Sequence, residues 1–178
     1  MDIIQFVEQS IGQWRSQRSA HHLAFSHFEA VQSIIDIDML SSADPAVIEL
    51  CQAYDLDPSR AVAPFQMKWV GQSDWDEDNP EVKGSAILVP VPDLVVPHSG
   101  KLLRDQGYAE TIAAAGDYHF LDDGTFVLIT AYERAAAEER IWFANPNLRF
   151  RVSLIKTSAG SGVVTASFSS EIRSSQPS

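Results

Sequence analysis

A chain of 178 residues, 45% hydrophobic and 21% charged, has the length and composition of one globular domain. Its formal net charge of −11 argues against nucleic acids and anionic membranes as partners, since both need concentrated Lys and Arg. The single cysteine, Cys51, excludes an internal disulfide, and no apolar run approaches the length of a membrane span. We therefore expect a cytoplasmic protein.

Two short helices are predicted, both early in the chain. The segment 2–12 carries apolar residues at roughly helical spacing, and Gly12 ends it. The second helix begins at Asp44-Pro45, with Asp as the N-cap and Pro in the first turn. Cys51 lies on its apolar stripe, where a cysteine behaves as a small hydrophobic residue.

The rest of the chain is predicted to form about ten short strands with turn signals between them. The strands cover 14–25, 28–40, 66–75, 83–91, 102–108, 116–121, 126–133, the two arms of 138–157, and 163–173. Because most connections are too short for parallel crossovers, we expect a mainly β protein, an antiparallel up-and-down β-barrel with room for a small ligand. Residues 1–173 then form a single barrel domain, and 174–178 a frayed tail.

The predicted hairpin 138–157 collects charged side chains on one face. Asn145-Pro146-Asn147 supplies the turn, and a turn centred on Pro146 makes paired positions sum to 292. Opposed residues share a face, which gives the pairs Phe143 with Arg149, Ile141 with Arg151, and Glu139 with Ser153. A solvated outer surface is the commoner fate of such a face. The alternative is a polar patch inside a cavity that binds an anionic ligand.

The last strand adds a second carboxylate to this face. Closing the pair 157 with 163 makes positions sum to 320, which places Glu171 opposite Arg149. On the outside, such residues would form cross-strand ion pairs that contribute about 0 to 1 kcal/mol each. Inside, they would form a preorganised cradle, because arginine forks bind carboxylates in bidentate fashion.

Three large side chains on the strand 66–75 share odd parity: Met67, Trp69 and Trp75. Plain core packing is one interpretation, since Trp is highly buried on average. The other is a platform against which a conjugated ring system stacks. The acidic neighbours Asp74 and Asp76 favour this second interpretation, because they are typical of a barrel rim.

The histidines do not indicate a metal site. His21 and His22 are adjacent on a predicted strand and point to opposite faces, so at most one looks inward. The other three are scattered, and none has zinc-site spacing. No Gly-rich phosphate loop, GxSxG motif or Cys–His pair is present in the sequence.

Six sequence blocks carry a family resemblance. They are WRSQRSAHHLAF from Trp14, WVGQSDWD from Trp69, VPVPD from Val89, LLRDQGYAE from Leu102, ERIWFANPNLRFRVS from Glu139 and ASFSSEIR from Ala166. Together they resemble the S-type phycobiliprotein chromophore lyases, the CpcS/CpeS family, over about 6–173. The resemblance implies a ten-stranded calycin barrel, similar to lipocalins and fatty-acid-binding proteins. It also implies a lyase that attaches a linear tetrapyrrole, or bilin, to a phycobiliprotein cysteine through a thioether bond.

The resemblance also implies site residues. The bilin pocket would be lined by Arg18, His21 or His22, Met67, Trp69, Trp75, Glu139, Arg149, Arg151, Ser153 and Glu171. The residues expected to act in the reaction are Glu139, Arg149, Arg151 and Trp75. The arginines suit the propionates, a glutamate suits the pyrrole N–H groups, and Trp75 suits the conjugated face. The nucleophile is the acceptor's thiolate, so the lyase contributes orientation and regioselectivity.

The implied partners follow from that chemistry. No tightly bound cofactor is expected, because the bilin is a substrate. Phycocyanobilin is the expected bilin, and no single residue of the sequence distinguishes it from phycoerythrobilin. The acceptors would be phycocyanin β or allophycocyanin subunits of a cyanobacterial phycobilisome, the photosynthetic antenna. A homodimer and a heterodimer with a related subunit are both compatible with the sequence. Two alternatives stay open: a non-catalytic carrier of a bilin or another amphiphile, and a supporting subunit of another lyase.

Overall fold

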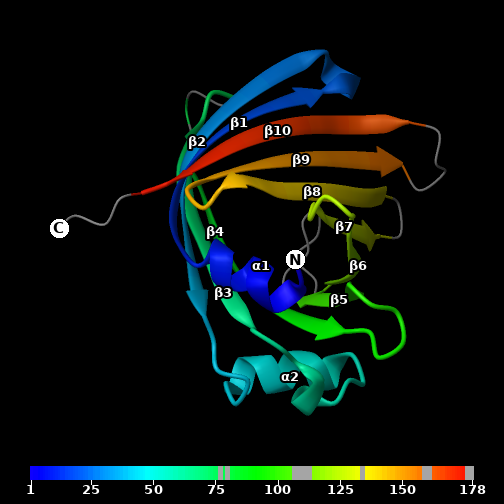
Figure 1. Cartoon of the computed structure of the whole chain (residues 1–178). Helices are drawn as coiled ribbons and strands as arrows, with labels where there is room; N and C mark the ends of the chain where they lie inside the picture. The colour runs from blue at the N-terminus through cyan, green and yellow to red at the C-terminus, as the bar shows by residue number, and fades with distance from the viewer. Residues whose placement is uncertain (76–77, 79–80, 106–113, 133–134, 158–161, 175–178) are drawn as a thin grey trace.

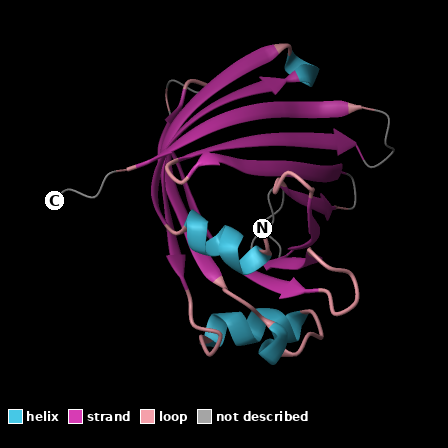
Figure 2. Cartoon of the chain, in the orientation of Figure 1, coloured by secondary structure: helices cyan, strands magenta, loops and turns pink. Residues whose placement is uncertain are grey.

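The structure, a computed structural model, describes residues 1–75, 78, 81–105, 114–132, 135–157 and 162–174. Ten strands close into one antiparallel barrel in which each strand pairs with its sequence neighbours and β1 also pairs with β10 (Figures 1 and 2). The predicted up-and-down barrel is therefore confirmed. The strands are β1 Gly12–His22, β2 His27–Met39, β3 Phe65–Ser73, β4 Glu81–Pro92, β5 Ser99–Arg104, β6 Ala114–Phe120, β7 Phe126–Ala131, β8 Ala135–Asn145, β9 Leu148–Thr157 and β10 Val163–Arg173.

The register of β8, β9 and β10 is the one that the turn residues predict. The pairs Glu139 with Ser153, Ile141 with Arg151, Phe143 with Arg149, and Arg149 with Glu171 all form. One detail is wrong: Val163 pairs with Lys156 rather than with Thr157, and an irregularity before Thr165 restores the predicted sum. The predicted strand ends near 106–108 and at 133, the 158–161 link and the tail at 175–178 lie outside the described residues.

Two predicted strand ends are wrong because local hydrogen bonds end the strands early. β1 stops at His22, and the chain turns through a short 3-10 helix, η1 (Leu23–Phe25), with Ser26 in the left-handed region at φ 49°. β3 stops at Ser73, whose hydroxyl accepts a hydrogen bond of 3.1 Å from the Trp75 N–H. Trp75 therefore lies beyond the sheet, and strand parity no longer sets its direction.

Both predicted helices form, and each is held by an aspartate at its start. In α1 (Ile3–Ser10), the Asp2 carboxylate accepts from the Gln5 N–H at 2.8 Å, and the Gln5 side chain accepts from the Asp2 N–H at 3.0 Å. In α2 (Pro45–Ala53), Asp44 accepts from the Ala46 N–H at 2.9 Å. The predicted apolar stripe, Cys51 included, packs on the outside of β4 and β5.

The main core fills one end of the barrel. α1 lies across this end (Figure 1) and inserts Phe6, whose ring stacks on Phe126 at a centroid distance of 4.5 Å. Tyr118 also stacks on Phe126, at a centroid distance of 5.8 Å, and inward apolar residues of β1 to β5, β7 and β8 belong to the same cluster. We call this the closed end. The inward side chains at the opposite end surround a cavity, and they form the candidate site.

Candidate functional site

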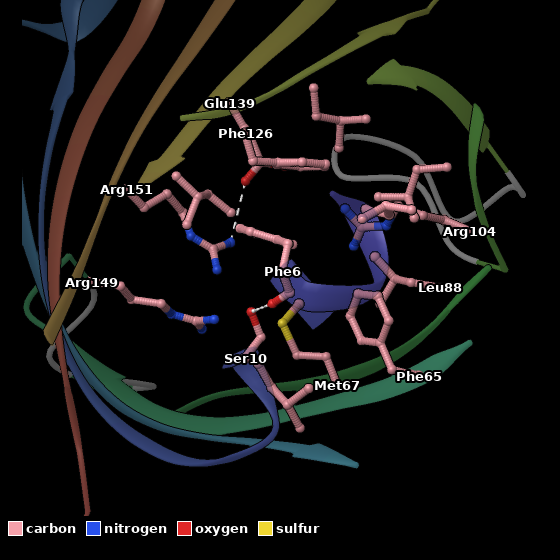
Figure 3. Close-up of a pocket in the computed structure, with 15 residues that line it drawn as sticks. Phe6, Ser10, Phe65, Met67, Leu88, Arg104, Phe126, Glu139, Arg149 and Arg151 are labelled. Atoms are coloured by element: carbon pink, nitrogen blue, oxygen red, sulfur yellow. Dashed lines mark hydrogen bonds and ion pairs between the residues drawn. The ribbon is translucent and has the colours of Figure 1, made fainter. Parts of the chain in front are cut away.

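A cavity of about 860 Å³ occupies the barrel beyond the closed end. This volume lies in the range of roughly 300–1,000 Å³ that is usual for small-molecule sites. Its wall consists largely of inward side chains of β1, β2, β3, β8, β9 and β10, and the exposed Glu81 and Lys83 on its lining show that it reaches the surface. We call this the open end. A second cavity of about 50 Å³ lies toward α1 and is shown in Figure 3.

Two arginines and two glutamates form a charged wall between the closed and open ends. Arg149 Nε donates to Glu171 Oε2. Arg151 Nη1 lies 3.3 Å from Glu139 Oε1, and its Nε lies 3.4 Å from Glu171 Oε1. Arg149 and Glu171 are each 1% exposed. The polar face of the hairpin thus points into the barrel, and the outer-surface interpretation is wrong.

The buried pair of the charged wall, Arg149 and Glu171, is ionised at neutral pH. Burial lowers the pKa of Arg149 to about 10, which leaves its guanidinium charged. Burial alone would raise the pKa of Glu171, but the charges of Arg151 and Arg149 and the hydrogen bond from Arg149 outweigh it. The pKa of Glu171 consequently lies below its ordinary value. The wall is therefore a set of fixed charges in a largely dehydrated site.

Trp14 holds Arg149 from the closed end. The Arg149 guanidinium carbon lies 4.5 Å from the centre of the Trp14 ring, and that of Arg173 lies 4.3 Å from it. The Trp14 N–H donates to the Ser10 carbonyl of α1 at 2.8 Å. Among the described residues, Arg149 Nη2 has no hydrogen-bond partner, and the side chain points toward the middle of the smaller cavity (Figure 3).

The two predicted arginines differ in access to the large cavity. Arg151 lines both cavities, whereas Arg149 lines only the smaller one. The polar residues continue from β9 across β10 to β1, because Arg151 pairs with Ser169 and Ser169 pairs with Arg18. Arg18 and Ser153 also line the large cavity. Arg18 and Arg151 thus share one inward face, two strands apart, with a hydroxyl between them.

A second polar cluster lies nearer the opening and centres on Glu29. Glu29 accepts a hydrogen bond of 2.6 Å from the Ser73 hydroxyl, its Oε2 lies 2.7 Å from His22 Nε2, and Arg18 Nη2 is 3.6 Å away. Burial alone would raise the pKa of Glu29, but the hydrogen bonds from Ser73 and His22 and the charge of Arg18 outweigh it. The pKa of Glu29 therefore lies below its ordinary value. Glu29 thus lines the cavity, and Ser73 holds its carboxylate by a hydrogen bond without lining the cavity itself.

Only some of the predicted aromatic and histidine residues line the large cavity. Met67 and Trp69 line the large cavity together, as predicted. Trp75 is not on that wall: it is 44% exposed at the rim, with its ring 4.5 Å from His22 and 4.2 Å from His27. His22 lines the cavity, whereas His21 points outward and contacts Phe28 at 4.2 Å. Of the two histidines, only His22 is placed to meet a ligand.

Sequence reasoning missed three residues of the site: Glu29, Ser73 and Arg104. Arg104 is 5% exposed and lines both cavities. Alternation along the strand 28–40 was a usable signal for Glu29, which shares the parity of the buried Val31 and Ile35. Arg104 shares the parity of the buried Leu102, but an arginine is almost never fully buried unless it is paired, so its residue type argues for the surface.

The described residues contain neither a metal-binding cluster nor a membrane-spanning helix. In the part of the chain that the structure describes, no three His, Cys, Asp or Glu side chains group closely enough to hold a metal ion. Within the same residues, the helices are too short and too polar for any of them to cross a bilayer.

The fold and the site define a closed β-barrel with an internal ligand cavity and a wall of fixed charges. The sequence profile of the family described as "CpeS-like protein" matches residues 2–174. The chain is 62% identical over 174 residues to a protein of Trichodesmium erythraeum named chromophore lyase CpcS/CpeS 3, covering 98% of this chain and 100% of that protein. The chain therefore belongs to the CpeS-like family, and the predicted relationship to the CpcS/CpeS lyases is confirmed.

Two further relatives agree. A protein of Microchaete diplosiphon named putative phycoerythrobilin lyase CpeS is 62% identical over 159 residues, which cover 89% of this chain and 71% of that protein. The solved S-type phycobiliprotein lyase of Guillardia theta superposes with a TM-score of 0.86 at 46% identity, covering 99% of this chain and 95% of that chain. The family and the fold are thus supported independently by sequence and by structure.

Proposed function

We propose that this protein binds a linear tetrapyrrole at the open end of its barrel and attaches it, through a thioether bond, to a cysteine of a phycobiliprotein subunit. The observation that carries the proposal is the cavity of about 860 Å³ with charged residues on its interior wall, in a member of the CpeS-like family. A bilin has two propionates, pyrrole-type nitrogens and an extended conjugated face. The cavity offers a group of complementary chemistry for each.

The propionates are assigned to Arg151 and Arg18. Both side chains line the large cavity on one inward face, and their separation by Ser169 allows two carboxylates to be gripped separately. Arg149 was also expected to bind a propionate. Since it is fully buried and paired with Glu171, we assign it the role of fixing Glu171 and, through it, Arg151.

The pyrrole nitrogens are assigned to Glu139, with Glu171 behind it. Both carboxylates line the large cavity, and both lie within 3.4 Å of Arg151 nitrogen atoms. A carboxylate that accepts the pyrrole N–H bonds favours the protonated and more electrophilic bilin. Met67 and Trp69 supply the apolar wall for the conjugated face, and Trp75 covers the chromophore from the rim.

The bond-forming step uses a nucleophile from the acceptor. The acceptor's cysteine thiolate adds to the exocyclic ethylidene carbon of ring A, a carbon–sulfur bond forms, and the displaced π electrons take up a proton. The addition has no leaving group and needs no oxidant. Because such an addition also occurs without an enzyme, the lyase acts by holding one bilin conformation with ring A at the opening.

The bilin and the acceptor are the finer parts of the proposal. The family resemblance suggested phycocyanobilin, although no single residue of the sequence distinguishes the two bilins. The 62% identity to a protein named putative phycoerythrobilin lyase favours phycoerythrobilin. We propose phycoerythrobilin on the strength of that identity and keep phycocyanobilin as the comparison. The phycocyanin β or allophycocyanin acceptor, the dimeric state and the cytoplasmic location stay predictions from the sequence.

The direct test is transfer to an acceptor. The purified protein is loaded with each bilin and mixed with apo-phycobiliprotein, and adduct formation is followed by acceptor fluorescence and by peptide mass. We expect one cysteine to be modified faster than in the lyase-free reaction. Bilin binding with adduct formation only at the spontaneous rate would establish the carrier alternative instead. Absence of bilin binding by the protein alone would favour a supporting subunit.

A further inference from the structure

We propose that an exposed apolar patch beside the cavity opening is the surface on which the acceptor protein docks; this inference rests on the proposed function. The patch, here called the rim patch, lies on the β1–β2 turn and the start of β10. Its members are Leu23 (51% exposed), Phe25 (74%), Phe28 (67%), Val163 (38%) and Val164 (36%). Apolar side chains gathered at this exposure on one end of a molecule mark an interaction site more often than a simple surface.

The rim patch is continuous with the cavity wall. His22 lines the cavity and pairs in register with Thr165, which also lines it, so the last residue of β1 lies beside the start of β10. The Trp75 ring lies 4.5 Å from the His22 ring and 6.2 Å from the Phe25 ring, so Trp75 connects the patch to the cavity lining. A protein seated on the rim patch would therefore stand directly at the opening.

The patch is held in place by local contacts. The Ser26 N–H donates to the Leu23 carbonyl at 3.3 Å, which closes the turn. The Phe28 ring packs edge-on against His21 at 4.2 Å. Trp75 is fixed by the hydrogen bond of its N–H to Ser73, which itself donates to Glu29. Aromatic side chains that are already ordered lose little conformational entropy on binding, and this is typical of interface anchors.

The chemistry identifies the occupant. The thioether bond forms between a bilin held in the barrel and a sulfur atom on another protein, so the acceptor must stand over the opening during the reaction. An anionic membrane is a poor occupant, because the chain carries a net charge of −11 and the rim patch contains no Lys or Arg. A second copy of this chain on the rim patch would obstruct the opening. The acceptor subunit is the partner that the position favours.

The chain provides a matched control surface at the closed end. Leu94 and Val95 are 81% and 86% exposed in the turn that follows β4. The start of β4, at Glu81, lines the large cavity, so the turn after Pro92 lies at the far end of the strand. The Asp93 carboxylate accepts from the Val95 and Val96 N–H groups at 2.7 and 2.9 Å, so this turn is also ordered. The two surfaces differ in their distance from the opening.

The test compares Phe25→Ser combined with Phe28→Thr against Leu94→Ser combined with Val95→Ser. Transfer is measured at saturating bilin with increasing apo-phycobiliprotein, and acceptor binding is measured separately by the fluorescence anisotropy of a labelled acceptor. We expect the rim variant to raise the KM for the acceptor and its Kd by about tenfold or more. Its bilin Kd and its melting temperature should stay at the wild-type values. The Leu94/Val95 variant should match the wild type throughout.

Three outcomes would overturn the docking proposal. One is an unchanged acceptor Kd in the rim variant. Another is an equal increase of the acceptor Kd in the Leu94/Val95 variant, which would indicate a general effect of removing apolar surface. The third is a change of oligomeric state without any acceptor present: if the wild type sediments as a dimer and the rim variant as a monomer, the rim patch is a contact between two copies. If the wild type binds the acceptor but transfers no bilin, the proposed function fails while the docking surface stands.

Discussion

The two ends of the barrel interior are built from the same sheet, but one is packed with apolar side chains and the other encloses a large cavity with polar residues on its wall. At the closed end, Phe6, Tyr118 and Phe126 stack on one another and leave only a cavity of about 50 Å³. At the open end, inward positions of the same sheet carry charges and hydroxyl groups around a cavity of about 860 Å³. The residues that stabilise the fold and the residues proposed to bind the ligand therefore lie at different ends of the barrel axis. Polar side chains are costly to bury without hydrogen-bond partners, so they line the cavity and not the core.

The boundary between the two ends is the charged wall. Arg149 and Glu171 are as buried as the apolar residues beside them, and Trp14 covers Arg149 from the closed end. A buried ion pair of this kind gives little net stability, because desolvation offsets the attraction. The ion pair serves instead to hold neighbouring side chains in place. It fixes Arg151 through Glu171, so that the binding groups are already ordered before a ligand arrives.

The largest expected effect comes from breaking this boundary pair. Replacing Arg149→Met leaves Glu171 buried with Arg151 at 3.4 Å as its remaining cationic partner, and we expect a loss of about 3 kcal/mol in the free energy of unfolding. Glu171 is 1% exposed, so water cannot replace the lost guanidinium. Urea unfolding measures the change. The double variant Arg149→Met with Glu171→Met should recover part of the loss, and equal stability of wild type and single variant would contradict the assignment.

The next effect separates binding from stability. Arg151→Gln removes a charge from the large cavity, and we expect the bilin Kd to rise by about tenfold to a hundredfold, as is usual for the loss of a charge-assisted hydrogen bond. Arg140→Gln is the matched control, because Arg140 lies on the neighbouring strand but pairs with Glu138 on the outer face. Absorbance titration gives both constants. A control variant that weakens binding as much as Arg151→Gln would place the ligand elsewhere.

A smaller effect tests the apolar wall. Trp69 lies flat against Gly84, and a Cβ at that position would stand 2.8 Å from Trp69 Cε2 and closer still to Cζ2. Gly84→Ala should push the ring into the cavity and raise the bilin Kd by roughly threefold to tenfold, about 1 kcal/mol. Adding Trp69→Leu should remove the coupling between the two positions. Gly162→Ala, where a Cβ meets nothing within 4 Å, serves as the control.

The smallest effect concerns pH. The pKa of Glu29 lies below its ordinary value of 4.5 in the folded protein, so its ionised form stabilises the fold above that value. As the pH falls through the lower folded pKa, this contribution is lost. The wild type should therefore lose more unfolding free energy between about pH 5 and pH 3 than Glu29→Gln does. Parallel pH curves for the two proteins would show that the network around Glu29 adds nothing to stability.

The sequence predicted the fold and the register well, for identifiable reasons. Asn145-Pro146-Asn147 fixes the hairpin, and the Asn147 N–H donates to the Asn145 side chain at 2.9 Å as such turns do. Once that turn is centred, parity determines the β8–β9 pairs. The pair of Arg149 with Glu171 depended on a second assumption, that 157 pairs with 163, and it forms because the irregularity before Thr165 restores the register. The sequence did not show which end of the barrel α1 fills. It also could not anticipate that Ser73 ends β3, so the shared parity of Trp75 with Met67 and Trp69 did not place the three on one wall, although the expected position of Trp75 at the rim agrees with the structure.

The most direct measurement of the central claim is the visible circular dichroism of a bilin titrated with the protein. A free bilin is flexible, whereas one held against a fixed asymmetric wall acquires a signal in its absorption band. The wild type should give a saturable signal at one bilin per chain, and Arg151→Gln should lose most of it at the same concentrations. No signal with the wild type, or an identical signal with Arg151→Gln, would contradict a binding site at the charged wall.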